Sequence, residues 1–116
     1  MENKRELGKR KESLACALLK ENGYQILERN FSCRFGEIDI IAKDGKYLVF
    51  VEVKYRKNTG SGYGLEAVDE RKQEKIRNTS LFYLTTRKKS IDVPIRYDVI
   101  EIIDHKYRVI KNAFSF

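Results

Sequence analysis

Four charged side chains stand inside two apolar runs of the segment 36–56. The runs read GEIDII and YLVFVEVKYR, and they carry Glu37, Asp39, Glu52 and Lys54. Charges in strands that enter a protein core are costly unless they are paired or bind a ligand. Two carboxylates on neighbouring strands can hold Mg²⁺, and a lysine beside them can stabilise the transition state of phosphodiester hydrolysis. A cross-strand salt bridge between Lys54 and either acid, solvated at a strand end, is the alternative.

A hairpin turn relates the two runs to each other. The Asp-Gly pair at residues 44–45 is a strong hairpin signal, and with it at the centre Lys43 pairs with Lys46. This register makes Asp39 and Glu52 diagonal neighbours, roughly 7–8 Å apart at the backbone. One cation would then be within reach of both carboxylates.

The same register sorts the side chains onto two faces, because successive residues of a strand point to opposite sides. The charged face should hold Glu37, Asp39, Ile41, Leu48, Phe50, Glu52 and Lys54. The apolar face should hold Ile38, Ile40, Ala42, Val49, Val51 and Val53. A slip of one residue would separate the acids.

Helical periodicity and stop signals predict two helices around this hairpin. The first spans residues 3–22 and ends at Gly23, and Glu12 lies at the border of its apolar stripe. That stripe is expected to consist of Leu7, Lys11, Leu14, Ala15 and Leu18. The second spans residues 65–84, and Lys72 falls on its inner face, where its stem could also snorkel to water. The other inner positions are Val68, Ile76, Thr79 and Tyr83.

Strand-like runs account for most of the remaining chain. They cover residues 24–31, 95–103 and 107–114, with a turn at 32–35. The resulting order is α-β-β-β-α-β-β, which predicts one α/β (α+β) domain over residues 1–116, with a central mixed five-stranded sheet flanked by helices. The glycine-rich segment 57–64 follows the charged strand, either as a loop beside a site or as a plain connector.

Composition narrows the functional classes. The 116 residues carry a net charge of +7 and 35% charged side chains, which favours a polyanionic partner, although the charge could serve solubility alone. The two cysteines lack zinc-site spacing, and only one histidine is present. No apolar run reaches the length of a membrane span. We therefore expect a cytoplasmic protein without a membrane partner.

The motifs GEIDII and FVEVKYR resemble the D…ExK core of the PD-(D/E)xK nuclease superfamily, which includes restriction enzymes and Holliday-junction resolvases. The resemblance is closer to the bacterial YraN family of endonuclease-like proteins, and it extends over GKRKESLACALLKENGYQILERNF, the GYG loop and IRYDVIEI. It implies a restriction-endonuclease-like core. Ile38 stands where the superfamily often has the proline of its name motif.

The resemblance also implies roles for individual residues. Asp39 and Glu52 would bind Mg²⁺ or Mn²⁺, with Glu12 as a further ligand. Lys54 would be the catalytic lysine, and Lys72 an additional basic residue near the phosphate. Glu37 would stand behind the ligands or be solvated at the strand end. The expected nucleic-acid-binding residues are Lys9, Lys54, Arg56, Lys57 and Lys72.

Three functional hypotheses follow. The first is a Mg²⁺-dependent endonuclease that hydrolyses DNA, on branched or junction structures. The second is a nucleic-acid-binding module of the same fold without robust catalysis. The third, ranked last, is an interaction protein whose charges are surface pairs. Junction-acting relatives work as dimers, which makes a homodimer an expectation of the resemblance.

Overall fold

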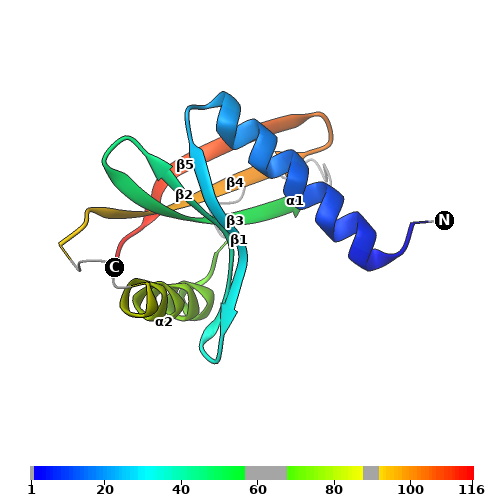
Figure 1. Ribbon diagram of the computed structural model, residues 1–116. Helices are drawn as coiled ribbons and strands as arrows, with labels where there is room; N and C mark the ends of the chain where they lie inside the picture. The colour runs from blue at the N-terminus through cyan, green and yellow to red at the C-terminus, as the bar shows by residue number, and fades with distance from the viewer. Residues whose placement is uncertain (1, 57–67, 88–91) are drawn as a thin grey trace.

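The computed structural model describes residues 2–56, 68–87 and 92–116. Its elements are α1 (Lys4–Glu21), β1 (Gln25–Cys33), β2 (Gly36–Asp44), β3 (Tyr47–Arg56), α2 (Glu70–Thr86), β4 (Ile95–Ile103) and β5 (Lys106–Phe114). The strands form one sheet in the order β1-β2-β3-β4-β5, in which β3 and β4 are parallel and the other neighbours antiparallel. The two helices cover opposite faces (Figure 1). The α/β fold with a mixed five-stranded sheet is confirmed.

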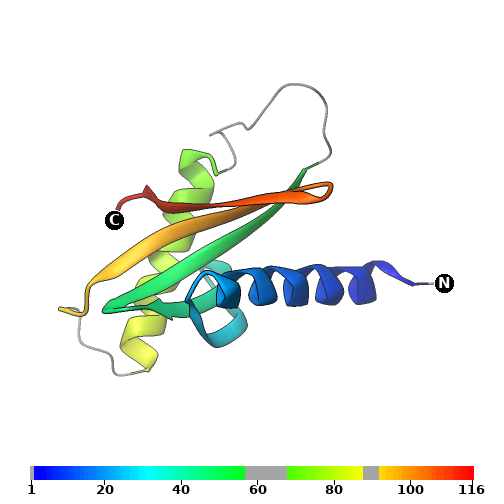
Figure 2. The same cartoon turned by 90° about the horizontal axis from the view of Figure 1, so that it is seen from above.

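Helix α1 is bounded by the signals read from the sequence. The Asn3 side chain accepts a 2.9 Å hydrogen bond from the backbone N–H of Glu6, which is typical of an N-cap. Beyond the C-cap Asn22, Gly23 has φ +90°, a conformation that favours glycine. The N-terminal end of α1 extends past the ends of β3 and of the β4–β5 hairpin (Figure 2).

The face that α1 buries differs from the expected stripe. Ala15, Cys16 and Leu19 are buried, whereas Leu14 is 46% exposed. Small side chains at the first two positions let the helix approach the sheet, and this rotates the stripe of larger residues outward. Glu12, at the border of the expected stripe, consequently turns toward the sheet, and only 12% of its side chain is exposed.

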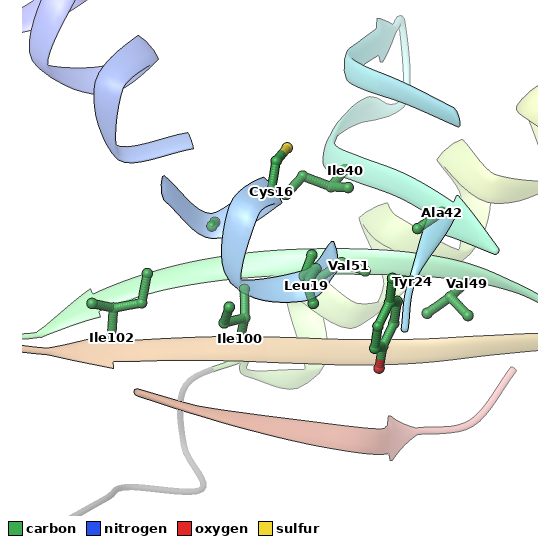
Figure 3. Packing of buried hydrophobic residues seen from close by; sticks show 10 residues of the cluster. Cys16, Leu19, Tyr24, Ile40, Ala42, Val49, Val51, Ile100 and Ile102 are labelled. Atoms are coloured by element: carbon green, nitrogen blue, oxygen red, sulfur yellow. The ribbon is translucent and has the colours of Figure 1, made fainter. Parts of the chain in front are cut away.

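Each face of the sheet has its own hydrophobic core. The α1 core joins Cys16, Leu19 and Tyr24 to strand residues such as Ile40 and Val51 (Figure 3). The α2 core consists of Ile38, Ile41, Leu48, Phe50, Val68, Ile76, Tyr83, Leu84, Tyr97 and Val99. The sheet is therefore fixed from both sides.

The register of the β2–β3 hairpin corrects the expected one by two residues. Asp44 pairs with Tyr47 and Lys43 with Leu48, so the turn centres on Gly45 and Lys46 rather than on residues 44–45. Gly45 has φ +61°, as the first central residue of a type II′ turn requires. Because the shift is an even number of residues, Glu52 and Lys54 keep the predicted face of β3, which they share with Leu48 and Phe50.

Strands β2 and β3 separate near Asp39. Their pairing ends at Ile40–Val51, while β2 stays paired with β1 as far as Gly36. Ile38 belongs to the α2 core, so its expected place on the apolar α1 face was wrong. The strand alternation changes phase where β2 leaves β3, opposite Asn30 of β1, which has φ +54°. We call this separation of β2 from β3 the fork.

The C-terminal half follows the predicted pattern with small changes at the boundaries. Helix α2 begins only at Glu70, behind the N-cap Asp69, and its inner face includes Ile76, Thr79 and Tyr83 as expected. The expected turn at 32–35 is shorter, because β1 continues to Cys33. The glycine-rich segment lies outside the described residues. Within the described ranges, no helix is long and apolar enough to cross a membrane.

Candidate functional site

The fork places Asp39 at the point where backbone pairing between β2 and β3 stops. Its Oδ2 accepts a 2.9 Å hydrogen bond from the backbone N–H of Val53, so the side chain occupies a position that the partner strand would otherwise fill. Continued past Ile40–Val51, where the pairing ends, this register would set Asp39 opposite Glu52 rather than diagonal to it. The strands separate there, and the charge of Asp39 acts on Glu52 across the fork.

Glu52 connects this point to the α2 side of the sheet. Only 6% of its side chain is exposed. Its Oε1 lies 3.2 Å from the Nζ of Lys72 and 3.9 Å from the Nζ of Lys54. Lys72 thus does not simply snorkel to water, and the structure brings together Asp39, Glu52, Lys54 and Lys72.

The electrostatics of this group are unusual. Burial, followed by the nearby charge of Asp39, raises the pKa of Glu52 to about 7, although both lysines act in the opposite direction. Burial also raises the pKa of Asp39, against the lowering effect of the Val53 N–H. Burial alone would lower the pKa of Lys72, but Glu52 and Asp39 raise it overall. Burial and the mutual repulsion of the two acids therefore outweigh the effect of the two lysines on the pKa of Glu52.

Glu12 is held close to these acids by other partners. Its Oε1 accepts hydrogen bonds from Arg29 Nε at 2.8 Å and from Asn30 Nδ2 at 2.9 Å. Arg29 additionally donates to Ser13 Oγ at 3.0 Å, which ties β1 to α1. The role of Glu12 as a third metal ligand stays a prediction, and this bracing by Arg29 and Asn30 was not foreseen from the sequence.

A divalent cation fits the donor set in one specific way. In the part of the chain that the structure describes, no three Asp, Glu, His or Cys side chains come together to hold a metal. Mg²⁺ does not need such a cage, because it keeps several waters and is bound through one or two carboxylates plus substrate phosphate. Asp39 and Glu52 supply two hard oxygen donors whose mutual repulsion a cation would relieve.

Two pockets meet at Glu37 and Asp39, and both acids line both pockets. The α1-side pocket, of about 520 Å³, reaches Glu12 and Tyr55. Its basic lining residues are Lys4, Arg5, Lys9 and Lys11. The α2-side pocket, of about 310 Å³, is lined by Gly36, Lys72, Lys75 and Ile76 in addition to the two acids. Positive side chains therefore flank the acids on both sides.

Of the residues expected to bind nucleic acid, three lie at the fork and one forms an ion pair elsewhere in the sheet. Lys9 lines the α1-side pocket, and Lys54 and Lys72 adjoin Glu52. Arg56 instead forms an ion pair with the fully buried Glu101, with Nε 3.0 Å from Oε2. Lys57 lies outside the described residues. Lys75 was missed, although its spacing of three from Lys72 could have indicated a shared helix face.

A second group of buried charges lies near the β2–β3 turn. Asp98 is fully buried and accepts hydrogen bonds from Arg96, from the Tyr24 hydroxyl at 2.5 Å and from the Asn112 N–H at 2.9 Å. Arg96 also donates to Asp44 at 2.6 Å. Because arginine and hydrogen bonds compensate this acid, the group stabilises the fold. The basic side chains beside the Asp39–Glu52 pair are instead the lysines Lys54 and Lys72.

Fold and site define the chain as an α/β protein whose forked sheet holds two largely buried acids, Asp39 and Glu52, and Asp39 lines two pockets that also carry basic side chains. The chain belongs to the Uncharacterised protein family UPF0102, whose model matches residues 11–102. A UPF0102 protein of Lachnoclostridium phytofermentans is 48% identical over 113 residues, covering 97% of this chain and 96% of the relative. One of Thermodesulfovibrio yellowstonii is 48% identical over 109 residues, covering 94% and 96%. A third, of Persephonella marina, is 47% identical over 111 residues, covering 93% and 92%.

Proposed function

We propose that this protein is a metal-dependent nuclease that hydrolyses phosphodiester bonds of DNA. The active site would lie at the fork between β2 and β3. The observation that carries the proposal is the approach of Asp39 and Glu52 from two strands, with the pKa of Glu52 raised to about 7 and two lysines alongside. Perturbed carboxylates beside a cleft are typical of functional sites. The resemblance of GEIDII and FVEVKYR to the PD-(D/E)xK and YraN proteins supports the same class.

Asp39 and Glu52 would hold Mg²⁺ or Mn²⁺, with Glu12 as a further ligand if Arg29 releases it. When bound, the metal supplies positive charge for the scissile phosphate and lowers the pKa of a water. The Val53 N–H favours the ionised form of Asp39, which is the form that can bind a cation. Lys54 and Lys72 stabilise the negative charge that the phosphate gains in the transition state.

Binding of the polyanion would rely on the basic residues around the fork. The α1-side pocket contributes Lys9, and the α2-side pocket contributes Lys72. Their charges contact phosphates and carry no sequence information. Branched or junction DNA is the substrate that the resemblance suggests.

Cleavage of a panel of labelled duplex, nicked, branched and single-stranded DNA and RNA in Mn²⁺ tests the proposal. Wild-type protein should cut at least one substrate, and Asp39→Asn and Glu52→Gln should abolish cutting while preserving folding. Lys20→Ala, an exposed change at the far end of α1, is the matched control and should leave the rate unchanged. Cleavage that survives both acid substitutions would falsify the assignment.

The rival function is nucleic-acid binding without robust catalysis. It is favoured by the basic side chains that line both pockets, because these would bind a polyanion with or without cleavage. On this account no substrate of the panel is cut, and neutralising Asp39 or Glu52 tightens binding by removing negative charge. The nuclease proposal predicts that the same changes eliminate turnover.

A further inference from the structure

The tip of the β1–β2 hairpin carries an aromatic side chain that the core does not require. Phe35 is 39% exposed and lies in the two-residue turn between β1 and β2. A single exposed hydrophobic residue is ordinary and needs no explanation. Phe35 differs because of what surrounds it.

Two neighbours fix the orientation of the Phe35 ring. Phe82 of α2 meets it edge to face, with ring centroids 6.0 Å apart. The Arg34 guanidinium lies 4.9 Å from the Phe35 centroid. A ring held in this way loses little additional side-chain freedom when a planar ligand stacks on the pair.

The tip lies beside the α2-side pocket, which leads to the candidate site. Gly36 follows Phe35 directly and lines this pocket together with Asp39, Lys72 and Lys75. A side chain at Gly36 would meet Thr79 Oγ1 at 3.2 Å and Lys75 Cβ at 3.5 Å, so the tip sits tightly against α2. Asp39 is four positions after Phe35, which is about 13 Å along a strand.

An aromatic ring and an arginine at the hairpin tip, with two lysines lining the adjacent pocket, match one ligand chemistry. Proteins bind single-stranded nucleic acid by stacking bases on aromatic and guanidinium planes while basic residues contact phosphates. A span of about 13 Å corresponds to at most roughly four nucleotides of a stacked strand. Bases inside a duplex are already stacked and would not be available to Phe35.

We propose that Arg34 and Phe35 form a binding site for an unpaired nucleobase, a few nucleotides from the phosphate held at Asp39. The inference rests on the proposed function, since it requires that the DNA strand which is cut at Asp39 also passes over Phe35. It adds that the substrate is unpaired on the α2 side of the scissile phosphate. A flap or a splayed branch has this property, whereas continuous duplex does not.

The test measures binding without cleavage, in the Asp39→Asn background. The probes are a short single-stranded DNA carrying 2-aminopurine at successive positions and a duplex of the same sequence. Phe35→Leu removes the aromatic face but retains an apolar side chain against Phe82. Phe35→Tyr keeps the ring, and Leu27→Ala is the matched control, because Leu27 is 38% exposed and lines a different pocket, away from the fork.

Stacking should quench 2-aminopurine at one or two positions. Phe35→Leu should weaken single-strand binding roughly tenfold, since a base–aromatic stack contributes about 1–3 kcal/mol. Phe35→Tyr and Leu27→Ala should bind as the parent does, and duplex affinity should be unchanged in all variants. Thermal unfolding of each variant shows whether a loss of binding merely reflects a loosened hairpin.

Two outcomes overturn the inference and can be told apart. If the Asp39→Asn parent binds DNA and Phe35→Leu binds the single strand equally well, the nucleobase site is wrong and the proposed function stands. An equal loss for single strand and duplex contradicts it in the same way. If the parent binds neither probe at low salt, the proposed function falls and this inference falls with it.

Discussion

At the scale of single residues, the buried acids of this chain divide into two kinds. Asp98 lies between Arg96 and the Tyr24 hydroxyl, so its charge is compensated. Asp39 and Glu52 act on each other's charge, and the cations that contact Glu52 are Lys54 and Lys72. Proteins generally compensate buried charges. The exception at the fork is the physical reason for assigning function there.

The raised pKa of Glu52 predicts how stability depends on pH. In the native state Glu52 keeps its proton up to a pKa of about 7, while the unfolded side chain releases it near 4.5. The native state therefore binds more protons in this window, and the free energy of unfolding should decrease as pH rises from about 5 to 7.5. The full contribution is at most about 3 kcal/mol.

Glu52→Gln should flatten this part of the pH profile, measured by denaturant unfolding without divalent cations. Glu37→Gln is the matched control, because Glu37 is an exposed acid two residues from Asp39. An unchanged slope in Glu52→Gln, or the same flattening in Glu37→Gln, would show that Glu52 does not titrate in this way.

At the scale of elements, the sequence predicted which side chains share a face better than which residues pair. Asp44-Gly45 and Gly45-Lys46 are both plausible turn centres, and glycine at a positive φ satisfies either. The two registers differ by two residues, so Asp39 and Glu52 remain on one side of the hairpin in both. A shift of two residues leaves each side chain on its predicted face of the strand. It changes which residue of the neighbouring strand each one pairs with.

The fork itself could not be read from the sequence. Alternation assumes a continuous ladder, but β2 leaves β3 at Asp39, and Ile38 therefore packs toward α2. There β2 packs against α2, which is distant in sequence. The face of α1 was likewise set by the close approach that Ala15 and Cys16 allow, which the positions of leucine do not indicate.

Gly36 is the point at which the hairpin tip and α2 come closest. Gly36→Ala should destabilise the fold by about 1–3 kcal/mol, because φ is +148° and the added methyl group would lie 3.2 Å from Thr79 Oγ1. Gly8→Ala, the contrasting control inside α1, should stabilise it by about 0.5–1 kcal/mol, since nothing lies within 4 Å. Denaturant midpoints measure both changes, and a Gly36→Ala protein as stable as wild type would contradict the tight packing.

The Asp98 group holds β4 against β5 and the β2–β3 turn. Asp98→Asn should destabilise the protein by about 3 kcal/mol, because it removes the fully buried partner of Arg96, whose own side chain is 11% exposed. Asp44→Asn, at a 21% exposed carboxylate of the same group, should cost less than about 1 kcal/mol. Equal effects in equilibrium unfolding would mean that burial does not distinguish the two acids.

At the scale of the whole molecule, part of the basic surplus behind the net charge of +7 lies around the fork. Basic side chains line both pockets at the fork, and the N-terminal part of α1 carries several of them beyond the sheet (Figure 2). The sequence indicated a polyanionic partner from net charge alone. Only the fold shows that the charge surrounds the acids.

This distribution predicts a strongly salt-dependent affinity for DNA. With about four to six phosphate contacts, the logarithm of the binding constant should fall with the logarithm of salt concentration at a slope of roughly −3 to −5. Lys9→Ala should reduce the steepness by about one unit, and Lys20→Ala should not change it. Fluorescence anisotropy across a salt series measures the slopes. A salt-independent affinity, or equal effects of the two substitutions, would contradict this picture.

The central claim, that Asp39 and Glu52 form a cation site at the fork, can be tested without knowing the substrate. Calorimetric titration of Mn²⁺ at pH 8 should show one binding site on wild-type protein. Because Glu52 retains part of its proton near pH 7, binding at that pH should be weaker and release protons. Asp39→Asn and Glu52→Gln should each abolish the heat signal, while Glu37→Gln retains it. Binding that persists in both of the first two variants, or a folded wild-type protein that binds no Mn²⁺, would contradict the account.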